Sequence, residues 1–144
     1  MIESHASSSA SVASLWSVCS DVSNWSQHLD TFTSVEPLDD GPTGVGSRFA
    51  VTQPGLPGAT YEITEWQPGK GFTWEAKTSG VRTTATHEVT TTESGSRVAL
   101  GIHWSGPLAW LVRLSMSRKT QRMIEVEATT LASVAESADR AGNE

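Results

Sequence analysis

The sequence has little cysteine, little positive charge and no long apolar run. A single cysteine, Cys19, excludes an internal disulfide and any metal site built from several thiolates. The net charge of −6 gives no general basic surface for a nucleic acid, whose phosphates need cations opposite them. The longest nearly apolar run, Pro107 to Val112, is too short to span a bilayer. We therefore expect no nucleic-acid partner and no transmembrane segment.

The N-terminal residues carry no recognisable export signal. Residues 1–5 lack the basic segment and the apolar segment of a secretory signal peptide. A lone cysteine without a disulfide partner also suits a reducing compartment. We expect a cytoplasmic protein.

The chain contains enough aromatic residues to form a packed core. Six Trp and three Phe in 144 residues argue against disorder, because disordered chains are poor in aromatics. A chain of this length suits one domain. We expect a single domain over residues 1–138 and a polar, frayed tail over residues 139–144.

Glycine and proline divide the middle of the chain into short segments that alternate between apolar and polar residues. Such alternation with regularly spaced turns is typical of an antiparallel meander with one face turned inward. The expected strands are residues 47–53, 60–66, 71–78, 81–91 and 97–104. Residues 2–9 alternate more weakly and are expected to form an edge strand.

The two ends of the chain have helical spacing instead. Residues 11–22 and 24–29 predict two short helices, the first capped by Ser11 or a nearby serine. No helix breaker follows Pro107 for about thirty residues, and Pro107 suits a first helical turn. The apolar stripe of this long helix is formed by Val112, Met116, Thr120, Met123, Glu127, Leu131 and Val134. A long helix must bury such a stripe, and the inner face of the sheet is the surface available.

Five stretches of sequence follow this order of elements. They are LWSVCSDVSNW (residues 15–25), GVGSRF (44–49), YEITEWQPGKGFTW (61–74), HEV (87–89) and GSRV (95–98). With this layout, the chain resembles the START-like superfamily, also called SRPBCC or helix-grip, and within it the proteins labelled polyketide cyclase/dehydrase. The resemblance extends from Ile2 to about Glu136.

The resemblance implies an α+β helix-grip fold. A curved antiparallel sheet of six or seven strands would wrap around the long C-terminal helix, with two short helices after the first strand. It also implies a cavity between the sheet and that helix. Members of this superfamily include lipid carriers, cyclases, hydrolases and cochaperones, and the resemblance implies no universal catalytic residue.

His87 and Tyr61 are the residues best suited to polar chemistry inside such a cavity. His87 shares the inward parity of Ala85 and Val89, and a buried imidazole can act as an acid, a base or a polar anchor. The alternative is a structural histidine bonded to a neighbouring strand or helix. Tyr61 shares the parity of Ile63, and it either orients a polar ligand group or fills the core with its hydroxyl at the rim.

The inner face of the sheet and the stripe of the long helix together supply the candidate ligand-binding residues. The same side chains would also suit ordinary core packing, because a helix lying flat on a sheet shows the same stripe. The candidates are Phe49, Val51, Tyr61, Trp74, His87, Ile102, Met116, Thr120 and Met123.

A basic cluster lies in the first half of the long helix. It consists of Arg113, Arg118, Lys119 and Arg122. Cations at this end oppose the helix dipole, so the cluster is a candidate contact for an anionic ligand, membrane surface or carrier protein. The alternative is a solvated helix face with Glu125 and Glu127 nearby.

The sequence leaves three functions open. The first is binding of a small hydrophobic or aromatic ligand. The second is a cyclase or aromatase in which His87, Tyr61 or an arginine moves protons, favoured by polar groups that converge in the pocket. The third is a protein-binding module without a ligand, favoured by a collapsed interior. No nucleophile motif, phosphate loop or histidine spacing suggests a metal or cofactor, and no catalytic residue can be named.

Overall fold

The computed structural model describes residues 1–142 of the chain. Its elements follow the predicted order of a strand, short helices, a meander and one long helix. They are β1 (Ile2–Ser8), α1 (Val12–Ser20), the 3₁₀ helix η1 (Val22–Asn24), α2 (Trp25–His28), β2 (Ser34–Pro37), β3 (Arg48–Thr52), β4 (Ala59–Gln67), β5 (Gly71–Thr78), β6 (Val81–Thr92), β7 (Gly95–Ser105) and α3 (Ala109–Gly142).

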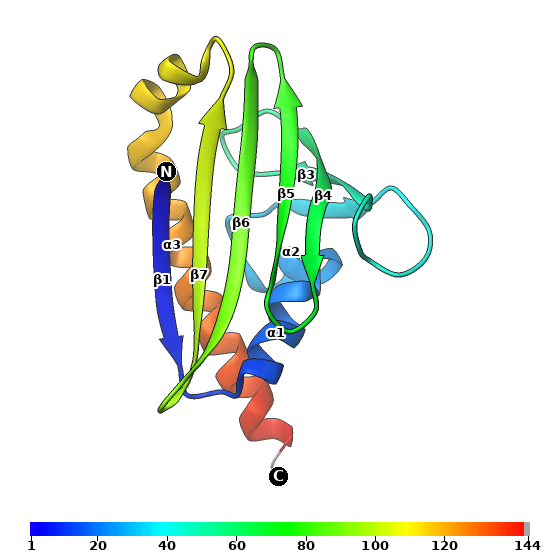
Figure 1. The fold of residues 1–144 in the computed structure, drawn as a ribbon, viewed down its shortest axis with the longest axis vertical. Helices are drawn as coiled ribbons and strands as arrows, with labels where there is room; N and C mark the ends of the chain where they lie inside the picture. Colours follow the sequence, from blue (N-terminus) through cyan, green and yellow to red (C-terminus); the bar gives the residue numbers. More distant parts are fainter. Residues whose placement is uncertain (143–144) are drawn as a thin grey trace.

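One antiparallel sheet of seven strands forms the body of the protein. Its strand order is β1-β7-β6-β5-β4-β3-β2, so β1 closes one edge by pairing with β7 along its whole length. Figure 1 shows α3 lying along one face of this sheet, with α1 and α2 on the same side. This arrangement confirms the predicted α+β helix-grip fold, with two short helices after the first strand.

Alternation along the strands decides which side chains reach the interior. In β7, Val98, Leu100 and Trp104 are buried, whereas Arg97 and His103 on the opposite face are exposed. A two-residue side-chain period on a sheet covered on one face produces this pattern. His103 therefore lies on the outer face of the sheet.

The structure corrects both ends of the long helix. Helix α3 begins at Ala109, and Pro107 lies in the turn before it instead of in its first turn. At the other end the helix continues to Gly142, where a frayed tail was expected from residue 139. The Asp139 carboxylate accepts hydrogen bonds from the Ser14 hydroxyl and the Ser11 amide, which hold this turn against α1. Residues 143 and 144 of the expected tail lie outside the described residues.

The elements after β1 are shorter than the sequence suggested. Helix α1 is capped by the Ser11 hydroxyl, as expected, but it ends at Ser20 and is followed by η1. Strand β2, which pairs with β3, was not among the expected strands. It has four residues and ends in Pro37, so it offers too short an alternation to be recognised.

The packed core lies under the second half of α3. Ile124, Ala128, Leu131 and Ala135 are buried there in one cluster with residues of α1, α2 and the sheet. Between residues 110 and 123 no side chain of α3 is fully buried. The first half of α3 is therefore held over the sheet without filling the space beneath it. No helix within residues 1–142 is long and apolar enough to cross a membrane.

Candidate ligand-binding site

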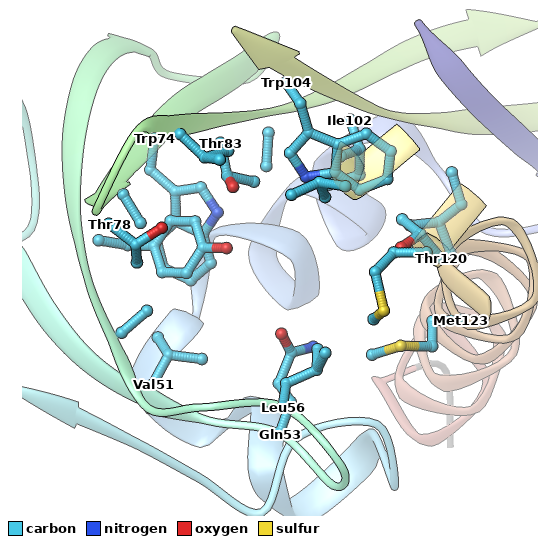
Figure 2. A pocket seen from close by; sticks show the side chains of 18 of the residues that line it. Val51, Gln53, Leu56, Trp74, Thr78, Thr83, Ile102, Trp104, Thr120 and Met123 are labelled. Carbon is cyan, nitrogen blue, oxygen red and sulfur yellow. The ribbon is translucent and has the colours of Figure 1, made fainter. Parts of the chain in front are cut away.

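A cavity of about 280 Å³ lies between the inner face of the sheet and the first half of α3. Figure 2 shows Thr120 and Met123 of α3 facing Trp74 and Thr78 of the sheet across this space. The loop of residues 53–58, between β3 and β4, closes a third side with Gln53, Leu56 and Pro57. Lys119 of α3 donates a hydrogen bond to the Gly55 carbonyl at 3.4 Å, which joins this loop to the helix.

Eight of the nine candidate residues line this cavity. They are Val51, Tyr61, Trp74, His87, Ile102, Met116, Thr120 and Met123. Phe49 does not line the cavity, because it is 1% exposed in the core and packs on Trp74 with the ring centroids 5.9 Å apart. Trp74, rather than Phe49, contributes the aromatic surface at this position.

Sequence reasoning missed part of the wall. Trp104 follows Ile102 with the same parity, and Glu127 follows Met123 by one helical turn, so both carried a detectable signal. Leu56 and its loop neighbours carried none, because a loop has no periodicity that places its side chains. Glu127 matters most, because it is the only carboxyl among the residues that line the cavity.

His87 is both a structural and a cavity-lining residue. Its Nδ1 lies 3.2 Å from the Phe72 carbonyl oxygen, and its ring stacks on Phe72 with centroids 4.2 Å apart. Gly71 makes this approach of β5 and β6 possible, because a Cβ there would collide with the His87 carbonyl. Burial lowers the pKa of His87 to about 4, against a smaller opposite effect of the Phe72 hydrogen bond.

The bond to Phe72 also decides what His87 offers to a ligand. A carbonyl oxygen only accepts hydrogen bonds, so Nδ1 must carry the proton of the neutral ring. The other nitrogen, Nε2, is then an acceptor on a ring that lines the cavity. The prediction that His87 points inward and is buried is confirmed, with 6% of the residue exposed.

Tyr61 packs against Trp74 on the cavity wall with the two rings tilted. Their ring centroids are 4.7 Å apart with an interplanar angle of 32°. Burial, and then the negative charge of Glu127, raise the pKa of Tyr61 to about 12, so its hydroxyl stays protonated. Tyr61 and Glu127 both line the cavity.

Glu127 is a buried carboxyl without a cationic partner. It is 8% exposed, and no ion pair within residues 1–142 involves it. Burial raises its pKa to about 7, and the neighbouring Thr31 hydroxyl lowers it by less. Thr31 Oγ1 is buried and has no hydrogen-bond partner among the described residues. Glu127 can therefore exchange a proton near neutral pH.

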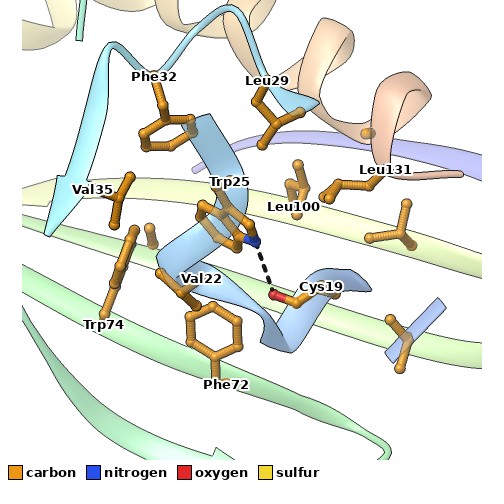
Figure 3. Packing of buried hydrophobic residues seen from close by; sticks show 14 of the residues in the cluster. Cys19, Val22, Trp25, Leu29, Phe32, Val35, Phe72, Trp74, Leu100 and Leu131 are labelled. Atoms are coloured by element: carbon orange, nitrogen blue, oxygen red, sulfur yellow. Dashed lines mark hydrogen bonds between the residues drawn. The ribbon is translucent and has the colours of Figure 1, made fainter. Parts of the chain in front are cut away.

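An aromatic cluster around Trp25 packs beside the cavity. The Trp25 indole donates a hydrogen bond to the Cys19 carbonyl at 3.2 Å, drawn in Figure 3. Its ring packs against Phe32, Trp74 and His87, each with centroids 5.3 Å away. Cys19 is fully buried here, and burial raises its thiol pKa to about 12, so it is not a reactive nucleophile.

All four members of the basic cluster are exposed, but two of them also donate hydrogen bonds to backbone carbonyls. Arg113 donates to the Trp104 carbonyl at 3.1 Å, and Lys119 is bonded to the loop as described above. Arg118 and Arg122 are exposed and line a shallow depression on the outer side of α3, together with Gln121 and Glu125. No group of three or more potential metal ligands is found among the described residues.

Comparison with known proteins gives a family match over most of the chain. The family model described as "Polyketide cyclase / dehydrase and lipid transport" matches residues 1–136. No curated protein matches the chain.

Solved structures share the fold at low sequence identity. The Zhui aromatase/cyclase from Streptomyces sp. R1128 is 15% identical, covers 94% of this chain and 92% of its own, and has a TM-score of 0.76. TTHA0849 from Thermus thermophilus is 15% identical, with 95% and 97% covered and a TM-score of 0.73. Ara h 8.0201 is 14% identical, with 94% and 96% covered and a TM-score of 0.65. Identities this low show the common fold alone.

Proposed function

Because the chain belongs to the polyketide cyclase/dehydrase and lipid transport family, we propose that it binds one small hydrophobic or aromatic molecule in the cavity between the sheet and α3. The observation that carries the proposal is the cavity of about 280 Å³ beneath the first half of α3. A helix packed flat on the sheet would leave no such space. Apolar walls with a few polar groups are typical of small-molecule sites.

The residues that line the cavity suit a flat ring system. Trp74 and Tyr61 contribute aromatic faces from the sheet, and Met116 and Met123 contribute thioethers from α3. Methionine adapts its conformation to irregular ligands and contacts aromatic rings favourably. The ligand-binding roles of these residues are part of the proposal.

A fluorescence titration tests the proposal. The uncharged probe N-phenyl-1-naphthylamine should bind the native protein saturably, with about one site per chain. Native mass spectrometry of freshly purified protein should reveal any co-purified ligand. Non-saturable fluorescence, or enhancement only after partial unfolding, would show that the cavity is not a binding site.

A cyclase or aromatase remains the second candidate. His87 and Tyr61 lie on the cavity wall, and the pKa of Glu127 near 7 suits proton transfer at neutral pH. No arginine lines the cavity among the described residues, so an arginine does not fill that role here. Turnover of a poly-β-ketone substrate analogue would favour the enzyme, and binding without turnover would favour a carrier. The open cavity weighs against a protein-binding module without a ligand.

The cellular location of the protein and its contact with an anionic partner are also proposals. A single buried thiol, Cys19, is compatible with the cytoplasm. The anionic partner is proposed to contact Arg118 and Arg122, whose side chains are exposed beside one surface depression.

A further inference from the structure

We propose that the cavity is selective for a hydrophobic amine, whose ammonium group pairs with the Glu127 carboxylate while its rings contact Trp74 and Tyr61. The inference rests on the proposed ligand-binding function and specifies the chemical class of the ligand. It depends on the position of one carboxyl in an otherwise uncharged wall.

The charges around the cavity are of one sign. Glu127 is its only carboxyl, and neither lysine nor arginine is among the residues that line it. The other titratable side chains on the wall are His87 from β6 and Tyr61 from β4. His87 is neutral above about pH 4, and Tyr61 is neutral below about pH 12. A bound anion would therefore meet no cation, whereas a bound cation would meet Glu127.

The hydrogen-bonding groups point to the same ligand class. Nε2 of His87 is an acceptor because Nδ1 donates to the Phe72 carbonyl. The ionised Glu127 carboxylate only accepts hydrogen bonds, and it has no ion-pair partner within residues 1–142. An ammonium group supplies up to three donors and a positive charge, which matches this set of acceptors.

The aromatic side chains add a second attraction. Trp74 and Tyr61 pack against each other on the cavity wall, and Trp104 of β7 adds another aromatic ring to the lining. The faces of such rings attract cations, most strongly when water is excluded. A hydrophobic amine can use both features at once, because its apolar body fills the cavity and its cationic end approaches Glu127.

In the free protein, Glu127 carries a proton that it can release when a cation binds. An unpaired buried carboxylate is costly, so the carboxyl retains a proton up to about pH 7. When an ammonium ion binds, Glu127 releases that proton to solvent and becomes the carboxylate of the ion pair. Binding of an amine should therefore strengthen as the pH rises towards 7, whereas binding of an uncharged ligand should not.

Three probes of matched shape test the inference by isothermal titration calorimetry. They are 1-naphthylmethylamine, 1-naphthalenemethanol and 1-naphthoic acid, which are cationic, neutral and anionic at pH 8. We expect the amine to bind at least about tenfold more tightly than the alcohol, and the acid to bind most weakly. Below pH 7 the amine affinity should rise about tenfold per pH unit, while the alcohol affinity stays constant.

Variants of two glutamates on α3 test whether Glu127 causes the selectivity for the amine and its pH dependence. Glu127→Gln should weaken binding of the amine at least about tenfold and abolish the pH dependence of that binding. The affinity for the alcohol should stay nearly unchanged. Glu125→Gln is the matched control, because Glu125 is exposed on the outer side of the same helix. If Glu127→Gln does not fold, the pH profiles of the amine and alcohol on the native protein still decide the question.

The outcomes separate the two proposals. If none of the three probes binds, the ligand-binding function itself fails. If the alcohol binds as tightly as the amine at pH 8, the cavity remains a binding site but its selectivity for amines is wrong. Tightest binding of the acid would also overturn the inference, because it would require a cation that the cavity wall does not contain.

Discussion

At the scale of single residues, burial acts on two ionisable side chains in opposite directions. It lowers the pKa of His87 to about 4 and raises the pKa of Glu127 to about 7. Both shifts favour the uncharged form, because neither side chain has a partner of opposite charge. Between about pH 4 and pH 7, both groups are therefore mainly neutral inside the folded protein.

Glu127 should make the protein less stable as the pH rises from about 4.5 to about 7. Its pKa is higher in the folded state than the ordinary value of 4.5, so its stabilising effect is complete below pH 4.5 and is lost as the pH rises through 7. The full loss is about 3 kcal/mol in the free energy of unfolding. Glu127→Gln should remove this loss, so the variant should gain stability relative to the native protein between pH 5 and pH 8.

Urea unfolding at the two pH values measures this effect. Glu125→Gln provides the control, because it removes an exposed carboxyl from the same helix. Equal pH dependence in the native protein and in Glu127→Gln would show that this carboxyl is not desolvated in the folded state.

His87 should have the opposite pH dependence. Its pKa is lower in the folded state than the ordinary value of 6.5, so its contribution is complete above pH 6.5 and is lost as the pH falls through 4. His87→Ala should remove this acid-side loss. It should also cost about 2–4 kcal/mol at pH 7, because it leaves a void and deprives the Phe72 carbonyl of its donor.

His103→Ala is the matched control for His87→Ala, since His103 is exposed on the neighbouring strand. Thermal and urea unfolding at pH 5 and pH 7 compare the two variants. A His87→Ala protein as stable as His103→Ala would contradict the structural role assigned to the ring.

Residue positions in the strands were predictable where alternation was regular. His87 was placed inside by the parity of Ala85 and Val89, and β6 keeps that parity through His87. Glu127 was recognised on the helical stripe but not as a site residue. Its helical spacing indicated the inward side of the helix, but whether a carboxyl there is buried depends on the cavity that the whole fold creates.

At the scale of the elements, α3 is divided into two halves with different environments. Its second half is buried against the core through Ala128, Leu131 and Ala135. Its first half lies over the cavity and exposes Trp110 and Leu114 on the other side, 59% and 79% exposed. The apolar stripe predicted the helix, but not that half of it would lie above an open space.

Filling the cavity from α3 should block the ligand without unfolding the protein. Thr120 lines the cavity from the first half of the helix, and Thr120→Trp would place an indole in that space. We expect loss of N-phenyl-1-naphthylamine binding with nearly unchanged melting, because no packed side chain has to move. In a packed interior the same change would cost about 1–3 kcal/mol.

Thr129→Trp makes the same substitution at an exposed position of α3 and should bind the probe normally. The two variants are compared by probe titration and by thermal melting. Strong destabilisation by Thr120→Trp alone would mean that the helix packs closely on the sheet at this position.

The outer side of the same helix segment carries the proposed contact for an anionic partner. Arg118 and Arg122 are exposed, and each should add about 1 kcal/mol to attraction by an anionic lipid surface. Vesicles that contain phosphatidylserine should therefore retain the protein at low salt, and phosphatidylcholine vesicles should not. The double variant Arg118→Gln/Arg122→Gln should lose this retention.

The double variant Arg97→Gln/Arg140→Gln removes the same charge from exposed sites elsewhere and serves as the control. Cosedimentation at low and high salt measures both proteins. Equal loss in the two double variants would indicate a general charge effect and would contradict a local contact at Arg118 and Arg122.

The ends of the elements were the least predictable features of the fold. Helix α3 reaches Gly142 because Ser11 and Ser14 of a distant segment bind Asp139, a contact that no local pattern shows. The strands of the meander were predictable because glycine turns separate them. Gly80, with a φ of +77°, is one such turn, and its carbonyl also accepts a hydrogen bond from Leu108 before α3.

At the scale of the whole molecule, β1 and α1 hold one end of α3. The Ser8 hydroxyl donates to the Ala132 carbonyl at 2.9 Å, and the Ser9 amide donates to the Glu136 carboxylate at 2.9 Å. Over the cavity, α3 is connected mainly through long polar side chains such as Arg113 and Lys119. One half of α3 is therefore held against β1, α1 and the core, and the other half overlies the cavity.

This division predicts a local effect of ligand on hydrogen exchange. Segments with few buried apolar contacts open more readily than core segments. Amides of residues 110–123 should therefore exchange faster than those of residues 124–135 in the free protein, and saturating ligand should slow them selectively. Mass spectrometry of peptides from both halves of α3, with N-phenyl-1-naphthylamine as the ligand, measures the difference.

Thr120→Trp should slow amide exchange in residues 110–123 without ligand, because the indole occupies the space. Uniform protection of both halves in the free protein would mean that α3 is supported along its whole length, and the cavity would then have to bind ligand without any change in the helix above it.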